Sequence, residues 1–111
     1  MSSPNARSKA YMEEKGYLVR IVEHWNPYAK RPGGGRGIRQ DLFGILDLVC
    51  IGHASTVGVQ ASSYSNLSAR VRKIGESDAI DLLREAGWTI QVHGWRKAAG
   101  GRWTVTVRDL S

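Results

Sequence analysis

The chain has very little cysteine and no long apolar run. Its 111 residues include a single cysteine, Cys50, so no internal disulfide can form, and we expect a buried thiol in a reducing compartment. The apolar runs are far too short to span a bilayer, and residues 1–9 lack the apolar centre of a signal peptide. We therefore expect no membrane association and a cytoplasmic location, in the host cytoplasm if the chain is viral.

Acidic residues are absent from residues 29–40, which read Ala-Lys-Arg-Pro-Gly-Gly-Gly-Arg-Gly-Ile-Arg-Gln. This composition predicts a mobile, glycine-rich loop that can approach phosphates closely, although a solvated flexible connection has the same pattern. The loop is not a P-loop, because no Gly-Lys-Ser/Thr closes it. The whole chain carries a net charge of +6, which favours a polyanionic partner, nucleic acid first. The cations of the 29–40 loop are Lys30, Arg31, Arg36 and Arg39.

Two short apolar runs, residues 41–51 and 56–62, form the centre of the sequence. They are joined by a few small residues, as neighbouring strands are. Acids stand at the head of the first run, and polar residues close the second. If these ends meet, they form an oxygen-rich site of the kind that holds Mg²⁺ or Mn²⁺.

The remaining pattern predicts helices and further strands around this pair. Ala6 to Gly16 suggests a helix, and β-branched residues follow it. The expected order gives an α+β fold in one domain, residues 1–111, with one mixed sheet, flanking helices and a flexible segment at residues 1–5. The expected helices cover 6–16, 65–75 and 78–86, and the expected outer strands cover 18–24, 88–95 and 102–108.

The helix after the second apolar run is basic. Ser65 or Asn66 can cap its start, where free N–H groups form an anion site. A second basic segment is a turn between Trp95 and Trp103, two aromatics that either stack on bases or pack across a hairpin. Together these segments add seven DNA-contact candidates: Ser65, Asn66, Arg70, Arg72, Lys73, Arg96 and Lys97.

Several short runs, taken in order, resemble the PD-(D/E)XK nuclease superfamily. The closest resemblance is to archaeal-type Holliday junction resolvases and their small phage relatives, and it extends from about Tyr17 to Trp103. The runs that carry it are Arg39-Gln-Asp-Leu-Phe-Gly-Ile-Leu-Asp47, Val59-Gln-Ala-Ser62, Ser68-Ala-Arg70 and Gly94-Trp-Arg-Lys97.

This resemblance implies a restriction-endonuclease-like core of α/β/α type and metal-dependent hydrolysis of DNA. In such enzymes the metal activates water and neutralises charge on the scissile phosphate. Asp47 matches the first acid of the motif, Gln60 stands where the second acid is expected, and Ser62 stands where the lysine is expected. The amide oxygen of Gln60 can still bind a hard cation, but Ser62 supplies no positive charge.

Other residues can compensate for these two departures. Asp41 becomes a second carboxylate ligand if the segment between it and Asp47 folds back; otherwise it is a turn or cap residue. Glu13, Glu14 or Glu23 can supply a third. Lys73, eleven residues after Ser62, can replace the missing lysine, or it can simply contact a phosphate.

Two principal functions remain open from the sequence. The first is a structure-selective DNA endonuclease of junction-resolvase type, and the alternative is a nuclease-fold DNA-binding protein that has lost catalysis. A protein that binds an acidic partner is a third, poorer reading. The resemblance also implies a homodimer, which suits a four-way DNA substrate with paired cuts.

Overall fold

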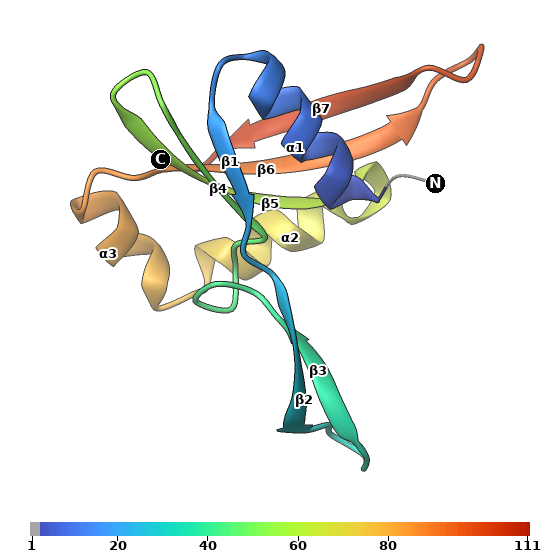
Figure 1. Ribbon diagram of the computed structural model, residues 1–111, viewed down its shortest axis with the longest axis vertical. Helices are drawn as coiled ribbons and strands as arrows, with labels where there is room; N and C mark the ends of the chain where they lie inside the picture. Colours follow the sequence, from blue (N-terminus) through green and yellow to red (C-terminus); the bar gives the residue numbers. More distant parts are fainter. Residues whose placement is uncertain (1–2) are drawn as a thin grey trace.

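Two central strands, β4 (Leu48–Gly52) and β5 (Ser55–Ser63), pair antiparallel at the middle of the molecule (Figure 1). The structure is a computed structural model that describes residues 3–111. Leu48 lies opposite Val59, and the tight turn between the strands places His53 and Ala54 at positive φ. The predicted pair of neighbouring apolar strands is therefore confirmed.

Three more strands complete a mixed five-stranded sheet. These are β1 (Leu18–Ile21), β6 (Thr89–Lys97) and β7 (Trp103–Asp109), and the order across the sheet is β1-β4-β5-β6-β7. Among the described strands of this sheet only β5 and β6 run parallel, and the chain crosses between them through the three helices that separate them in sequence. The expected α+β class with a mixed sheet is confirmed, but the expectation of a single sheet is wrong, because a second, two-stranded sheet is also present.

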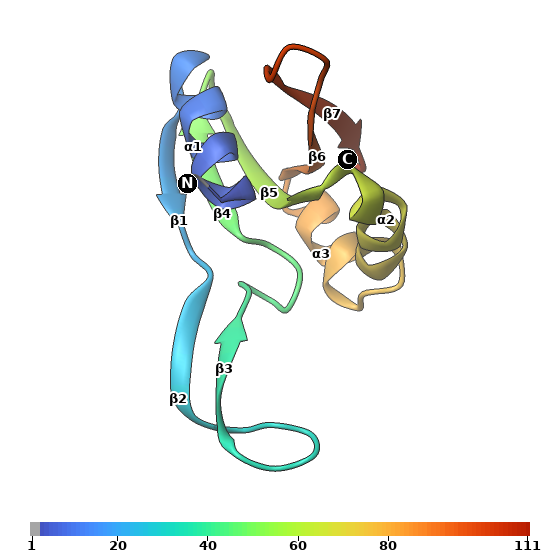
Figure 2. The ribbon, with the colours of Figure 1, turned by 90° about the vertical axis from the view of Figure 1, so that its right-hand side faces the viewer.

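Helices cover both faces of this sheet (Figure 2). Helix α1 (Pro4–Glu14) lies on one face, while the short helix η1 (Tyr64–Asn66), α2 (Leu67–Gly75) and α3 (Ala79–Glu85) follow β5 on the other. A separate apolar core fills each side, and Cys50 is buried in the one under α1. Within residues 3–111, no helix has both the length and the apolar character that crossing a bilayer requires.

The first helix begins earlier than the sequence predicts. Ser3 is its N-cap, accepting a hydrogen bond from the amide of Ala6, and Pro4 occupies the first turn, where its missing N–H costs nothing. The expected flexible segment is thus wrong for Pro4 and Asn5, while residues 1 and 2 lie outside the described part of the chain. Gly16, at φ 98°, ends the helix as predicted.

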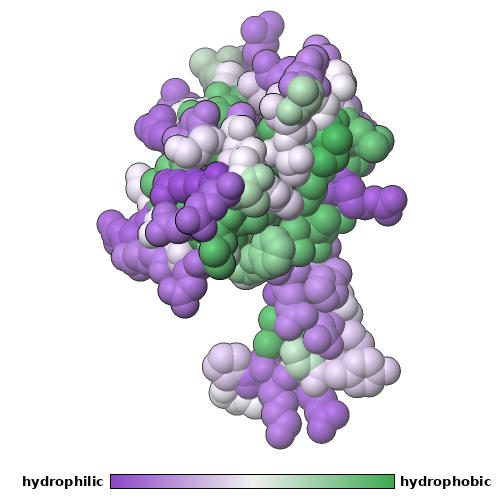
Figure 3. Space-filling view, turned by 90° about the vertical axis from the view of Figure 1, so that its left-hand side faces the viewer, coloured by the Kyte–Doolittle hydropathy of each residue, from purple (hydrophilic) through white to green (hydrophobic). Residues whose placement is uncertain are grey.

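The segment predicted as a basic loop is largely a β-hairpin. Strands β2 (His24–Lys30) and β3 (Arg36–Gln40) pair antiparallel, and only the tip is irregular. Pro27 sits where the register shifts, so its missing N–H does not interrupt the ladder. The glycines that suggested a loop are concentrated at residues 33–35, all at positive φ. The hairpin projects from the body of the protein (Figure 1), and its surface is mostly hydrophilic (Figure 3).

Candidate metal centre

Asp47 stands at the junction of three strands. It directly precedes β4, its N–H donates to the carbonyl of Val59, and its own carbonyl accepts from the amides of Val22 and Glu23. The register of β4 and β5 places Asp47 opposite Gln60, on the sheet face that carries α2. One carboxylate oxygen of Asp47 accepts the amide N–H of Ala61 at 2.9 Å. The backbone therefore holds this carboxylate in a defined position.

The segment between Asp41 and Asp47 folds back, as the sequence reading required. The amide of Leu42 donates to the carbonyl of Leu46 at 2.8 Å, and the amide of Gly44 donates to the carbonyl of Asp41. Phe43 and Gly44 both have positive φ. This turn returns the chain to the head of β4 and brings Asp41 beside Asp47.

The third carboxylate is Glu23, in the link between β1 and β2. Glu23 accepts hydrogen bonds from the side-chain amide of Asn5 at 2.9 Å and from the guanidinium of Arg39 at 3.3 Å. Glu13, another candidate for this role, pairs instead with Lys9 on the exposed side of α1. The structure therefore selects Glu23 from the three acids that the sequence left open.

Glu23, Asp41 and Asp47 each place one carboxylate oxygen within 4.8 Å of the others. A cavity of about 220 Å³ opens over the three acids. Besides the acids, it is lined by Arg39, Gln60, Ala61 and Arg70. A second hollow, of about 480 Å³, adjoins it through Arg39 and Asp41 and also contains Lys73.

The electrostatics of this cluster are unfavourable for a carboxylate without a cation. Asp47 is 4% exposed, and its pKa is raised chiefly by desolvation, then by the hydrogen bond with Asp41 and the negative charges of Asp41 and Glu23. The amide of Ala61 acts in the opposite direction, lowering the pKa. A divalent cation would relieve both the burial and the repulsion, so the cluster has the donor chemistry of a Mg²⁺ or Mn²⁺ site.

Gln60 lines the same cavity with a neutral side chain. Its side chain is 1% exposed, and its Nε2 donates to Oδ2 of Asp41 at 3.2 Å. Its Oε1 is fully buried and has no hydrogen-bond partner within the described residues. A buried carbonyl oxygen left unpaired costs free energy, and a cation at the acids would satisfy it once the amide turned so that Oε1, rather than Nε2, faced Asp41. The site therefore fits the metal that the resemblance implies.

Two cations of α2 face the acids. Lys73 Nζ lies 3.4 Å from Oδ2 of Asp41, and Arg70 lines the cavity one turn earlier. Ser65 and Asn66, at the start of the helix, do not line either hollow, and Asn66 makes no side-chain cap bond. Positive charge thus reaches the centre from the body of the helix rather than from its N-terminus.

Ser62 does not join the site. It is buried, and its hydroxyl donates to the carbonyl of Ser63 at 3.0 Å. Ser62 is not among the residues that line either hollow. The residue at the expected lysine position therefore supplies no group to the acid cluster.

The other predicted DNA contacts lie away from the acids. Lys30, Arg31 and Arg36 are exposed on the hairpin beyond the site. Arg72 is exposed on α2. At the far end of β6, Arg96 packs on the ring of Tyr64 and Lys97 lies 5.8 Å from the ring of Trp103.

Two contributors to the site were not predicted in these roles. Asn5 supports Glu23 from α1, and Arg39, expected only to bind phosphate, pairs with the same carboxylate. Asn5 had no sequence signal, because 18 residues separate it from Glu23. Arg39 had only its proximity to Asp41.

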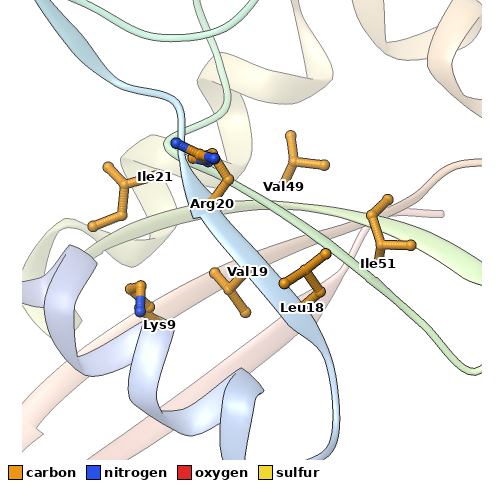
Figure 4. Close-up of a pocket in the computed structure, with 7 residues that line it drawn as sticks. All are labelled: Lys9, Leu18, Val19, Arg20, Ile21, Val49 and Ile51. Carbon is orange, nitrogen blue, oxygen red and sulfur yellow. The ribbon is translucent and has the colours of Figure 1, made fainter.

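A more apolar hollow lies elsewhere, on β1 and β4 (Figure 4). Its volume is about 460 Å³, and no acid is among the residues that line it: Lys9, Leu18, Val19, Arg20, Ile21, Val49 and Ile51. It has no group able to bind a hard cation or to activate water, so we place the candidate site at the acid cluster.

Comparison with known proteins adds no assignment. No family model, no curated protein and no solved structure matches this chain.

Proposed function

We propose that this protein is a metal-dependent DNA endonuclease with a variant PD-(D/E)XK site, of Holliday junction resolvase type. The observation that carries the proposal is the convergence of three carboxylates in a cavity that Gln60 also lines, with Lys73 3.4 Å from Asp41. The expected Asp47, the substituted Gln60 and a lysine from elsewhere are all at one place. The helices on both sheet faces agree with a restriction-endonuclease-like core.

The residues divide into ligands and cations. Asp47, Asp41, Glu23 and Gln60 Oε1 would hold Mg²⁺ or Mn²⁺, and the bound metal would supply Lewis acidity toward the phosphate and a more acidic water. Lys73 is placed to hold a water by donating a hydrogen bond. Arg39 and Arg70 flank the acids and would bind the phosphates on either side of the scissile bond.

DNA, as a branched or junction substrate, is the proposed partner, and the cytoplasm, of the host if the chain is viral, is the proposed location. A two-fold homodimer belongs to the same proposal, because symmetric incision of a four-way junction needs two copies of the site. Sedimentation of the protein alone and with a junction tests the dimer.

The alternative is a nuclease-fold protein that binds DNA without cutting it. Gln60 in place of an acid removes one negative charge from the ligand set, and the bond from Ser62 to Ser63 leaves that position without a catalytic group. Both features weaken metal binding and water activation relative to the usual motif.

Cleavage of labelled four-way junction, flap and linear duplex DNA, with Mg²⁺ or Mn²⁺, tests the proposal. We expect cutting by the parent, none by Asp47→Ala, and parental cutting by Asp81→Asn, a control that removes an exposed acid paired only with Arg84. Binding without cutting in either metal would establish the alternative. Equal loss of binding and cutting in Asp47→Ala would contradict the ligand role.

A further inference from the structure

The β2–β3 hairpin has no core of its own and no helix packed on it. Its strands contact mainly each other, and the ribbon extends away from the body (Figures 1 and 2). Seven residues of β2 extend about 20 Å. An isolated two-stranded ribbon is only marginally stable in water, so burial does not explain why this one is present.

The ribbon is stiffened locally. A Cβ at Gly37 would lie 2.2 Å from the ring of Trp25, so the indole packs directly on the glycine backbone. Asn26 accepts the amide of Tyr28 and donates to Gln40, which holds the turn at Pro27. At the tip, Arg31 donates both its amide to Gly35 and its guanidinium to the carbonyl of Arg36. The segment is thus a shaped arm with a small tip.

The exposed surface of the arm is basic and aromatic. Tyr28 is 80% exposed and Trp25 is 54% exposed. Lys30, Arg31 and Arg36 surround the tip, and no acid lies between His24 and Gln40. Such a surface gains free energy by meeting a polyanion that also offers apolar or aromatic groups.

The root of the arm is the metal centre. Glu23 directly precedes β2 and Asp41 directly follows β3, so both legs of the hairpin end in candidate ligands. Arg39, on β3, pairs with Glu23 across this root. A duplex held by the arm therefore has its backbone next to the acids.

We propose that the β2–β3 hairpin is a groove-binding arm that enters the major groove of duplex DNA beside the metal centre. The major groove of B-DNA admits a two-stranded β-ribbon. Lys30, Arg31 and Arg36 contact phosphates at the groove edges, and Tyr28 lies against the base edges. This inference deepens the proposed function by naming the groove and the segment that reads it, and for its ligand it rests on that function.

The geometry also separates DNA from double-stranded RNA. The major groove of A-form RNA is too deep and narrow for side chains to read. The arm should therefore bind a DNA duplex in preference to an RNA duplex of the same sequence, and the preference should disappear when the arm is altered.

Binding of fluorescent DNA and RNA duplexes, measured by anisotropy in EDTA, tests the arm without any cleavage. For Arg31→Gln/Arg36→Gln we expect the slope of log K against log salt to fall by about 2, with about tenfold weaker DNA binding per lost contact. The matched control Arg102→Gln/Arg108→Gln removes the same charge from exposed positions at β7 and should keep the parental slope. Tyr28→Ala should lose the protection of guanine N7 from methylation that the parent gives.

Mn²⁺ binding and thermal unfolding of each variant keep the arm and the metal centre distinguishable. Weakened DNA binding with parental Mn²⁺ affinity and melting supports the arm, even if the parent cuts no DNA. If the parent cuts DNA while the arm variants keep its salt slope and its methylation protection, the proposal of a groove-binding arm is overturned. The nuclease proposal then still stands. Equal binding of RNA and DNA duplexes by the parent also overturns it.

Discussion

The ammonium group of Lys73 lies 3.4 Å from Oδ2 of Asp41, although 32 residues separate them in the chain. The two residues come from α2 and from the turn before β4, which meet only in the folded protein. Lys73 is 41% exposed, so the pair contributes little to stability. The pair matters for its position, because it puts the positive charge of Lys73 beside the acids. The resemblance implies a lysine there, and the matching position in the sequence is Ser62.

Lys73→Gln should therefore lower cleavage by about a hundredfold, the order expected for the loss of one charged hydrogen-bond donor at a reaction centre, while DNA binding weakens only slightly. Lys15→Gln, which changes an exposed lysine at the C-cap of α1, is the control and should cut normally. Single-turnover cleavage on a junction, with binding measured separately, distinguishes the two. A Lys73→Gln enzyme with the parental cleavage rate would exclude this lysine from the chemistry.

Metal binding should depend on pH in a defined direction. Burial and the neighbouring acids raise the pKa of Asp47, so near neutrality this carboxylate holds a proton that a metal must displace. Mn²⁺ affinity should rise with pH through the neutral range and level off once Asp47 is ionised. Calorimetry in buffers of different ionisation enthalpy measures the released proton.

In Asp47→Asn that proton release should disappear and affinity should fall, whereas Asp81→Asn should behave as the parent. The same Mn²⁺ affinity at pH 6 and pH 8 in the parent would mean that the metal does not displace a proton from Asp47.

His93 should make the fold sensitive to acid. It is fully buried, with Nδ1 at 2.9 Å from Ser8 Oγ, and burial lowers its pKa to about 4. In the unfolded chain His93 takes up a proton near pH 6.5. The stability that comes from keeping His93 neutral and buried is therefore fully present above that pH and is lost as the pH falls toward 4. The loss should approach about 3 kcal/mol.

Urea unfolding at pH 7.5 and pH 4.5 measures this effect. His93→Gln should have a smaller difference between the two pH values, while His24→Gln, exposed at the start of β2, should keep the parental difference. An unchanged difference in His93→Gln would assign the acid sensitivity to another group.

Gly58 should not tolerate a side chain. A Cβ there would lie 2.7 Å from Cδ1 of Leu46, within the core that holds the turn before Asp47. Gly58→Ala should lower the free energy of unfolding by about 1–3 kcal/mol and weaken Mn²⁺ binding through displacement of that turn. Gly75→Ala, where open space surrounds the new methyl group, is the control and should unfold like the parent.

The class of fold was predictable because its signals are local. Short apolar runs, capping residues and stopping glycines located nearly all of the helices and strands, and Gly16 and Gly87 end helices at positive φ as expected. The hairpin was missed because Gly33, Gly34 and Gly35 suggested a loop over the whole segment although they lie at its tip. The pairing of Trp25 with Arg39 also connects residues whose local sequence does not resemble a strand.

The candidate site was only partly predictable for a related reason. Asp47 and Gln60 follow from strand order, because adjacent antiparallel strands in register bring such residues opposite each other. Other features of the site depend on side-chain directions and on contacts between distant segments. These are the choice of Glu23 over Glu13, the hydrogen bond from Asn5 to Glu23, and the absence of Ser62 from the cavity lining.

By itself, the sequence determined the α+β class, the buried thiol of Cys50, the two central strands and the basic character of the surface, since each depends on composition or on short-range pattern. Only the tertiary structure decided which acids meet, that Lys73 reaches Asp41, and that Gln60 donates a hydrogen bond to the same carboxylate. The reason is physical: electrostatic coupling and desolvation depend on distances through space, which the fold sets across long separations in the chain.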